Sequence, residues 1–136
     1  MASKEKAPLP DFAEKLPFVI DVYGRVMSGV LLLMGLFHWA VLMGVVEGQG
    51  GLFEDMTAGW KMATITLAVV DLVAAVGLWQ RVAWGNVLWY AAALFEVAIH
   101  TVFAGAFGAD YIIVAFHVFS VAGFVALSVI ARRVAR

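Results

Sequence analysis

The chain has 136 residues, of which 64% are hydrophobic and only 14% are charged, and its formal net charge is −1. Soluble domains have about 45–50% apolar and about 25% charged residues, so this composition indicates an integral membrane protein. The charge argues against a nucleic-acid partner, and the absence of cysteine excludes disulfides, iron–sulfur clusters and thiolate metal sites.

A polar tail, residues 1–16, begins the chain, and Pro8 and Pro10 disfavour regular structure within it. Four apolar stretches follow, each of a length that can cross a bilayer. The predicted spans cover residues 18–46, 61–80, 83–107 and 111–131. A basic tail, residues 132–136, ends the chain. Because the connections are short, neighbouring helices must run antiparallel. We therefore expect an all-α, four-transmembrane-helix up-down bundle over residues 17–131.

The basic residues indicate how this bundle is oriented. In a four-span arrangement every lysine and arginine except Lys61 falls on the side of the two termini. Basic residues mark the cytoplasmic side of bacterial inner-membrane proteins. The opposite side carries an acidic rim made of Glu47, Glu54, Asp55 and Asp110. We therefore expect a multi-pass protein of the bacterial inner membrane with both termini in the cytoplasm.

Each predicted span carries small or polar residues on one helical face. These residues are Gly24, Ser28, Gly35 and His38; Thr64, Asp71 and Ala75; Ala92, Glu96 and His100; and His117, Ser120 and Ser128. Small residues let helices approach closely, and polar side chains can hydrogen-bond between them. We expect these four faces to meet inside the bundle.

Five ionisable side chains on these faces lie at matching depths. With a rise of about 1.5 Å per residue, His38, His100 and His117 lie about 9–12 Å from the non-cytoplasmic ends of their spans. Asp71 and Glu96 lie about 15 Å deep, near the centre of the bilayer. Ionisable groups at such depths normally face a protein interior or a water-filled cavity. We expect all five in one enclosed pocket nearer the periplasm than the cytosol.

The first interpretation of this cluster is structural, with each side chain hydrogen-bonded across the bundle for roughly 1 kcal/mol. The second is a cofactor site. His100 and His117 could ligate haem b, with His38 as an alternative ligand. The same three histidines and Glu96 could instead hold a divalent metal.

The third interpretation is proton handling by Asp71 and Glu96, through a half-channel that opens toward the acidic rim. A quinone or another small apolar molecule near Trp89 and Tyr90 is a further alternative. The remaining aromatic residues at span ends are expected to be interface anchors. They are Trp60, Trp79, Trp84 and Tyr111.

Short stretches of the chain resemble known families. Val76-Gly77-Leu78-Trp79, Trp84-Gly85-Asn86-Val87-Leu88-Trp89, Glu96-Val97-Ala98-Ile99-His100 and Phe116-His117 are similar to the DUF6163 type of uncharacterised small alphaproteobacterial membrane proteins. Gly24-Arg25-Val26, the run from Leu31 to His38 and the run from Asp71 to Trp79 resemble, more distantly, DoxX-like four-helix membrane proteins. The first resemblance implies a four-span inner-membrane protein with no established activity. The second implies partnership with redox or stress-response proteins.

With such short loops, little of the chain would stand outside the bilayer to form an independent enzyme. No nucleophile with a base partner and no phosphate-binding glycine loop is present in the sequence. We therefore expect a non-enzymatic accessory subunit of a larger membrane assembly, surrounded by lipid and bound to a membrane-protein partner or to copies of itself. The haem- or metal-binding redox protein and the proton-handling protein stay as alternatives.

Overall fold

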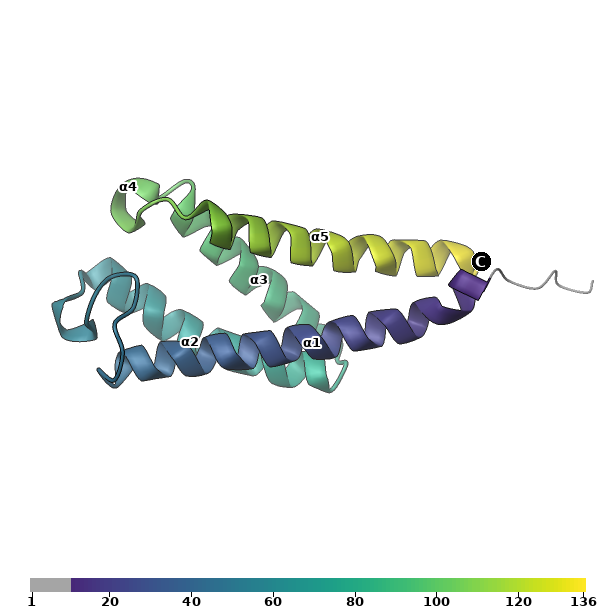
Figure 1. Ribbon diagram of the computed structural model, residues 1–136, viewed down its shortest axis with the longest axis horizontal. Helices are drawn as coiled ribbons and strands as arrows, with labels where there is room; N and C mark the ends of the chain where they lie inside the picture. Colours follow the sequence, from purple (N-terminus) through teal and green to yellow (C-terminus); the bar gives the residue numbers. More distant parts are fainter. Residues whose placement is uncertain (1–10) are drawn as a thin grey trace, which may run out of the picture.

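The computed structural model describes residues 11–136, and every regular element in this range is a helix (Figure 1). The long helices are α1 (Asp11–Leu42), α2 (Ala58–Trp79), α3 (Ala83–His100) and α5 (Tyr111–Val134). The short ones are η1 (Phe53–Asp55) and α4 (Ala104–Phe107). The predicted all-α class is confirmed. Pro8 and Pro10 lie outside the described residues.

Within residues 11–136, α1, α2 and α5 are long and apolar enough to cross a membrane. Their mean hydropathies over the most apolar window are 1.7, 2.0 and 2.4. Three such helices fit the membrane protein that the composition predicted.

Some helix ends differ from those expected. Residues 11–16 belong to α1 and not to a tail, and α1 ends at Leu42, not near residue 46, because Gly44 adopts a positive φ of 70°. The helix expected to reach residue 107 ends at His100. Thr101 leaves the helical conformation with φ −120° and ψ −74°, and α4 follows as a separate turn.

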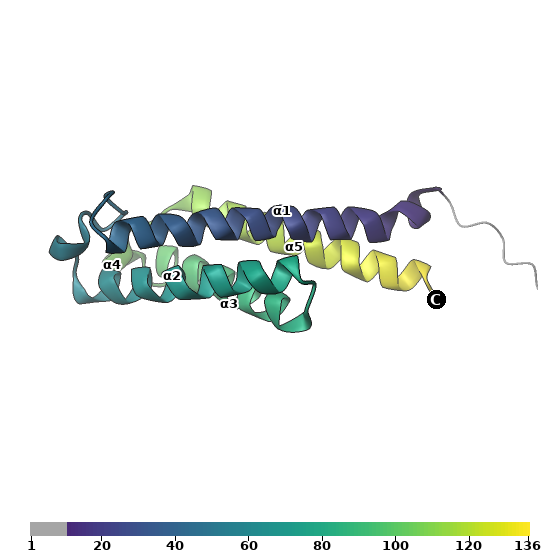
Figure 2. The ribbon, with the colours of Figure 1, turned by 90° about the horizontal axis from the view of Figure 1, so that it is seen from below.

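The helices pack in the order α1 on α2, α2 on α3, α3 on α5 and α5 on α1. The termini end of the molecule comprises the start of α1, the α2–α3 turn and the end of α5; the loop end comprises residues 43–57 and α4. Both views show α1 alongside α2 (Figures 1 and 2). Figure 1 shows that α1 and α5 lie close together near the termini end and diverge toward the loop end.

Charged and small residues fix the termini end. Asp21 Oδ2 lies 3.5 Å from Arg25 Nε, one turn later on α1, and Asp21 also pairs with Arg81 of the α2–α3 turn. Next to that turn, the backbones of α2 and α3 are in direct contact at Gly77 and Gly85. A Cβ added to Gly85 would lie only 2.3 Å from the carbonyl carbon of Gly77. The tight turn between α2 and α3 therefore requires glycine.

The four predicted faces do meet. Ten of the residues on them are buried: Ser28, Gly35, Thr64, Asp71, Ala75, Ala92, Glu96, His100, His117 and Ser120. Gly24, His38 and Ser128 are half-buried. The Ser28 hydroxyl donates a hydrogen bond of 2.7 Å to the carbonyl of Ala75, across α1 and α2. Polar residues thus join helices in the way that the spacing predicted.

Candidate functional site

A histidine of α1 faces an aspartate of α2. His38 Nδ1 lies 3.4 Å from Asp71 Oδ2. Asp71 shares the buried face of α2 with Leu67, Ala68 and Ala75, so the helical repeat holds its carboxyl inside the protein with 0% exposure. His38 is half-buried and closes the pair from the side of α1.

A second pair joins α3 to α5. His117 Nε2 lies 3.3 Å from Glu96 Oε2. The two residues are 1% and 4% exposed. Glu96 lies on the buried face of α3 with Ala92 and Ala93. Each of the four long helices therefore contributes one ionisable side chain to a carboxyl–imidazole pair.

Several atoms of the two pairs have no hydrogen-bond partner among residues 11–136. They are His38 Nδ1, both carboxyl oxygens of Asp71, Glu96 Oε1 and both ring nitrogens of His117. The pairs are thus close enough for charge interaction, but their orientation is not that of a hydrogen bond. The four residues come from neighbouring helices, and together they form one carboxyl–imidazole cluster. Buried polar groups are normally satisfied, so this cluster is unusual.

His100 has a different environment. Its Nδ1 lies 3.0 Å from the carbonyl oxygen of Gly108. A carbonyl only accepts hydrogen bonds, so Nδ1 carries the hydrogen in this contact. The bond connects the end of α3 to the turn before α5. The ring of His100 also packs 6.3 Å from that of Trp60, measured between centroids.

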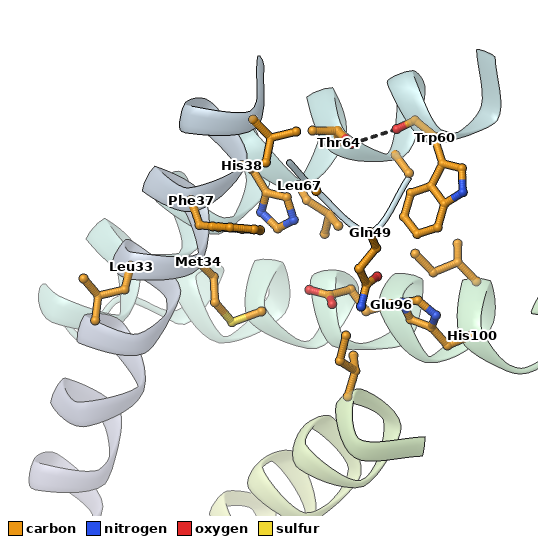
Figure 3. A pocket seen from close by; sticks show the side chains of 15 residues that line it. Leu33, Met34, Phe37, His38, Gln49, Trp60, Thr64, Leu67, Glu96 and His100 are labelled. Atoms are coloured by element: carbon orange, nitrogen blue, oxygen red, sulfur yellow. Dashed lines mark hydrogen bonds between the residues drawn. The ribbon is translucent and has the colours of Figure 1, made fainter. Parts of the chain in front are cut away.

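A cavity of about 440 Å³ lies at the loop end, between α1, α2, α3 and the start of α5 (Figure 3). Its walls are mainly apolar, and its polar lining comes from His38, Gln49, Thr64, Glu96 and His100. Asp71 and His117 are not part of the lining. Each carboxyl–imidazole pair therefore has one member at the cavity and one behind it.

The structure thus brings the predicted residues together only in part. Three of the five line one cavity, and the other two are paired with lining residues. Among residues 11–136, no three histidine and carboxylate side chains are placed to hold a metal ion. The metal set expected from His38, His100, His117 and Glu96 is therefore not assembled. Haem ligation by His100 and His117 stays a prediction, although His117 faces Glu96 in this structure.

Two lining residues were not predicted. Gln49, in the loop that follows α1, donates from Nε2 to Asp110 Oδ2 at 3.1 Å and so connects the α1–α2 loop to the start of α5. Trp60, expected as an interface anchor, lines the cavity. Gly50 permits this arrangement, because a Cβ there would lie 2.7 Å from Trp60 Cγ. The glycine next to Gln49 was the available signal for a loop that folds back tightly.

Trp89 and Tyr90, the residues expected near a bound quinone, do not line the cavity. Trp89 is 0% exposed and packs in the apolar core, with its ring centroid 5.3 Å from that of Phe124. The other expected anchors, Trp79, Trp84 and Tyr111, are exposed.

Comparison with known proteins gives a family and no function. A search of curated proteins found no match, and a search of solved structures found none either. A family model described as "Family of unknown function (DUF6163)" matches residues 18–135, which include all four long helices apart from the first turns of α1. Both carboxyl–imidazole pairs and the cavity lie inside the matched region. The chain therefore belongs to the DUF6163 family of unknown function.

Proposed function

We propose that this protein is a membrane protein that takes up and releases protons through its two buried carboxyl–imidazole pairs. The observation that carries this proposal is the order of residues around the cavity. His38 lines the cavity with Asp71 behind it, and Glu96 lines it with His117 behind it. In each pair a proton can reach the outer residue from the cavity and pass to the inner one.

The chemistry of the pairs suits this exchange. Imidazole is the side chain whose unperturbed titration falls between about pH 5 and 8. A carboxylate beside it can accept the proton that the ring releases. The Nδ1–Oδ2 separation of 3.4 Å and the Nε2–Oε2 separation of 3.3 Å already allow direct transfer once the side chains turn into a hydrogen-bonding orientation.

A purely structural role fits these pairs less well. Polar groups retained only to fix helix register are stabilising when every member is hydrogen-bonded, and each unsatisfied buried atom costs about 1–3 kcal/mol. Both oxygens of Asp71 and both ring nitrogens of His117 lack such partners among the described residues. By contrast, Ser28 and Tyr23 donate well-formed bonds of 2.7 and 2.6 Å between helices elsewhere in the molecule.

We further propose that α3 is a fourth membrane crossing. Its start lies at the termini end, where Arg81 pairs with Asp21 of α1. Its end lies at the loop end, where Gln49 bonds to Asp110 ahead of α5. If α1, α2 and α5 cross the bilayer, the chain between α2 and α5 has to cross it once more. The 18 residues of α3 rise about 27 Å, close to the thickness of the hydrocarbon core.

The proposed orientation places both termini in the cytoplasm of a bacterium, with the protein in its inner membrane. Arg25, Arg81, Arg132 and Arg133 belong to the termini end, whereas Lys61 is the basic residue near the loop end of the described chain. This distribution follows the positive-inside tendency. The cavity would then open toward the periplasm.

Proton uptake by the purified protein tests the proposed function. Potentiometric titration in detergent between about pH 5 and 8 should show fewer bound protons for Glu96→Gln and for Asp71→Asn than for the unaltered protein. Glu54→Gln is the matched control, because it makes the same substitution at an exposed position on η1, outside the pairs. Identical titration curves for all four proteins would refute proton exchange at these pairs.

A subunit role within a larger membrane assembly is a second candidate, and the apolar core favours it. Met27, Leu31, Leu78, Trp89 and Phe124 separate the paired residues from the termini end. A proton taken up at the pairs therefore meets no polar route onward through these residues, and a partner would have to receive it. Extraction in mild detergent at native abundance tests this role: co-purification with a membrane protein supports it, and an isolated monomer contradicts it.

A further inference from the structure

We infer that the cavity binds an organic ammonium ion, that is, an amine with N–H donors on a small apolar body. This inference deepens the proposed function. It rests on that function in one respect, because both proposals use Glu96. It names the class of ligand that the cavity would take. Three features of the described residues support it: the hydrogen-bonding character of the lining, an unpartnered carboxyl oxygen, and the charge at the loop end.

The polar lining offers mainly hydrogen-bond acceptors. His100 uses Nδ1 to donate to the carbonyl of Gly108, which leaves Nε2 as its acceptor. His38 directs Nδ1 toward Asp71 Oδ2 at 3.4 Å, so Nε2 is the ring nitrogen that is left for a ligand. The Thr64 hydroxyl donates 2.8 Å to the carbonyl of its own helix at Trp60, so its lone pairs stay available.

Gln49 adds a further acceptor. Its amide nitrogen donates to Asp110, which leaves the carbonyl oxygen free to accept. Figure 3 shows His38, Gln49, Glu96 and His100 extending into the same space, with the indole nitrogen of Trp60 on the side of its ring away from His38. A lining of acceptors selects a ligand that supplies donors.

Glu96 supplies the charge that distinguishes an ammonium from a neutral donor. The residue is 4% exposed and lines the cavity. Its Oε2 faces His117, and its Oε1 has no hydrogen-bond partner among residues 11–136. An ammonium N–H placed against Oε1 would form a charge-assisted hydrogen bond, which is roughly twice as strong as a neutral one.

The walls and the mouth of the cavity suit the rest of the ligand. Phe37 and Trp60 line it with aromatic rings, which attract cations and pack against apolar groups. The cavity volume of about 440 Å³ lies within the range of about 300–1,000 Å³ that is typical of small-molecule sites. The loop end carries four carboxylates and one lysine, and this excess of negative charge favours cations over anions. The carboxylates are Glu47, Glu54, Asp55 and Asp110.

Titration calorimetry of the full chain in detergent tests the inference with three matched probes. We expect 2-phenylethylammonium to bind, its N,N,N-trimethyl analogue to bind about tenfold more weakly because it lacks N–H donors, and phenylacetate not to bind. Glu96→Gln should weaken 2-phenylethylammonium binding at least about tenfold. Glu54→Gln, which lies outside the cavity lining, should leave binding within about twofold.

A second variant keeps the test decisive if Glu96→Gln does not fold. Ile113→Trp fills the cavity from α5 without altering a polar group, and it should abolish binding. Equal binding of the ammonium and the carboxylate probe, or no binding of either to the unaltered protein, would overturn the inference.

Two further arms separate the possible outcomes. Nanodiscs with and without phosphatidylethanolamine distinguish the sources of the ammonium: competition by this lipid assigns the site to a lipid amine, and the lack of competition assigns it to a free amine. Proton titration of the same sample separates this inference from the proposed function. Normal proton uptake without ammonium binding would refute the ligand and leave proton exchange standing.

Discussion

The two ends of this molecule use polar residues in opposite ways. Near the termini end, α1 and α5 approach each other over an apolar core that includes Trp89 and Phe124, and the hydroxyl of Tyr23 is fully engaged with the carbonyl of Ser120. Toward the loop end the same helices diverge and a cavity opens, and several atoms of the carboxyl–imidazole pairs have no hydrogen-bond partner within residues 11–136.

This difference indicates a division of roles along the helices. A close-packed apolar region contributes stability, whereas a cluster of buried ionisable groups without hydrogen-bond partners costs stability and is retained where function needs it. We therefore expect substitutions near the termini end to affect mainly folding. Substitutions in the pairs should affect mainly proton uptake. The following predictions test this contrast.

The largest loss of stability is expected for Trp89→Ala. This side chain is 0% exposed, and its removal leaves a large cavity in the core. The free energy of unfolding should fall by about 3–5 kcal/mol, measured by denaturation in mixed micelles. Leu94→Ala, at a position that is 71% exposed, is the control and should stay within about 0.5 kcal/mol of the unaltered protein. Similar losses for both variants would contradict the assignment of the core.

The next largest loss of stability is expected for Gly85→Ala. The free energy of unfolding should fall by about 1–3 kcal/mol, because the added methyl group would overlap the backbone of α2 at Gly77. Gly105→Ala is its matched control, since a Cβ at that position meets no atom within 4 Å. Thermal unfolding of the two variants under the same conditions measures the difference. Equal stability would mean that α2 and α3 are not in close contact near their turn.

Tyr23→Phe should lower the free energy of unfolding by about 1 kcal/mol, because it removes a 2.6 Å hydrogen bond and leaves the carbonyl of Ser120 without that donor. Tyr111→Phe serves as control at a residue that is 77% exposed. Chemical denaturation of both variants gives the comparison, and an unchanged midpoint for Tyr23→Phe would show that α1 and α5 are not joined there.

The smallest loss of stability is expected in the pairs. Glu96→Gln keeps the shape of the side chain and replaces the carboxyl group with a neutral amide of nearly the same size. Its free energy of unfolding should change by less than about 1 kcal/mol, and proton uptake should fall. A loss as large as that of Trp89→Ala would instead make this pair a structural element.

Helical spacing was sufficient to predict which faces are buried, because small and polar residues repeat at three- and four-residue intervals in every long helix. It was not sufficient to pair the residues. The depth estimate matched His117 with His100, but the structure places it against Glu96, one turn earlier on α3. One turn is only about 5.4 Å, and uncertain span ends produce an error of that size.

The end of α3 and the role of Gln49 could not be predicted for a different reason. Val102 and Phe103 are as apolar as the helix before them, so hydropathy gives no sign that the helix stops at His100. At this point the His100 ring bonds to the carbonyl of Gly108, a contact outside the helix that hydropathy does not describe. Gln49 reaches the cavity through the fold of a glycine-rich loop, which no periodic pattern describes.

Infrared difference spectroscopy tests the central claim most directly, because it detects the protonation of individual carboxyl groups. Spectra of the purified protein taken between about pH 5 and 8 should show carboxyl bands that change with pH. One band should be absent in Glu96→Gln and another in Asp71→Asn, and all should persist in Glu54→Gln. Carboxyl bands that stay constant across this range, or that change equally in every variant, would contradict proton exchange by the buried pairs.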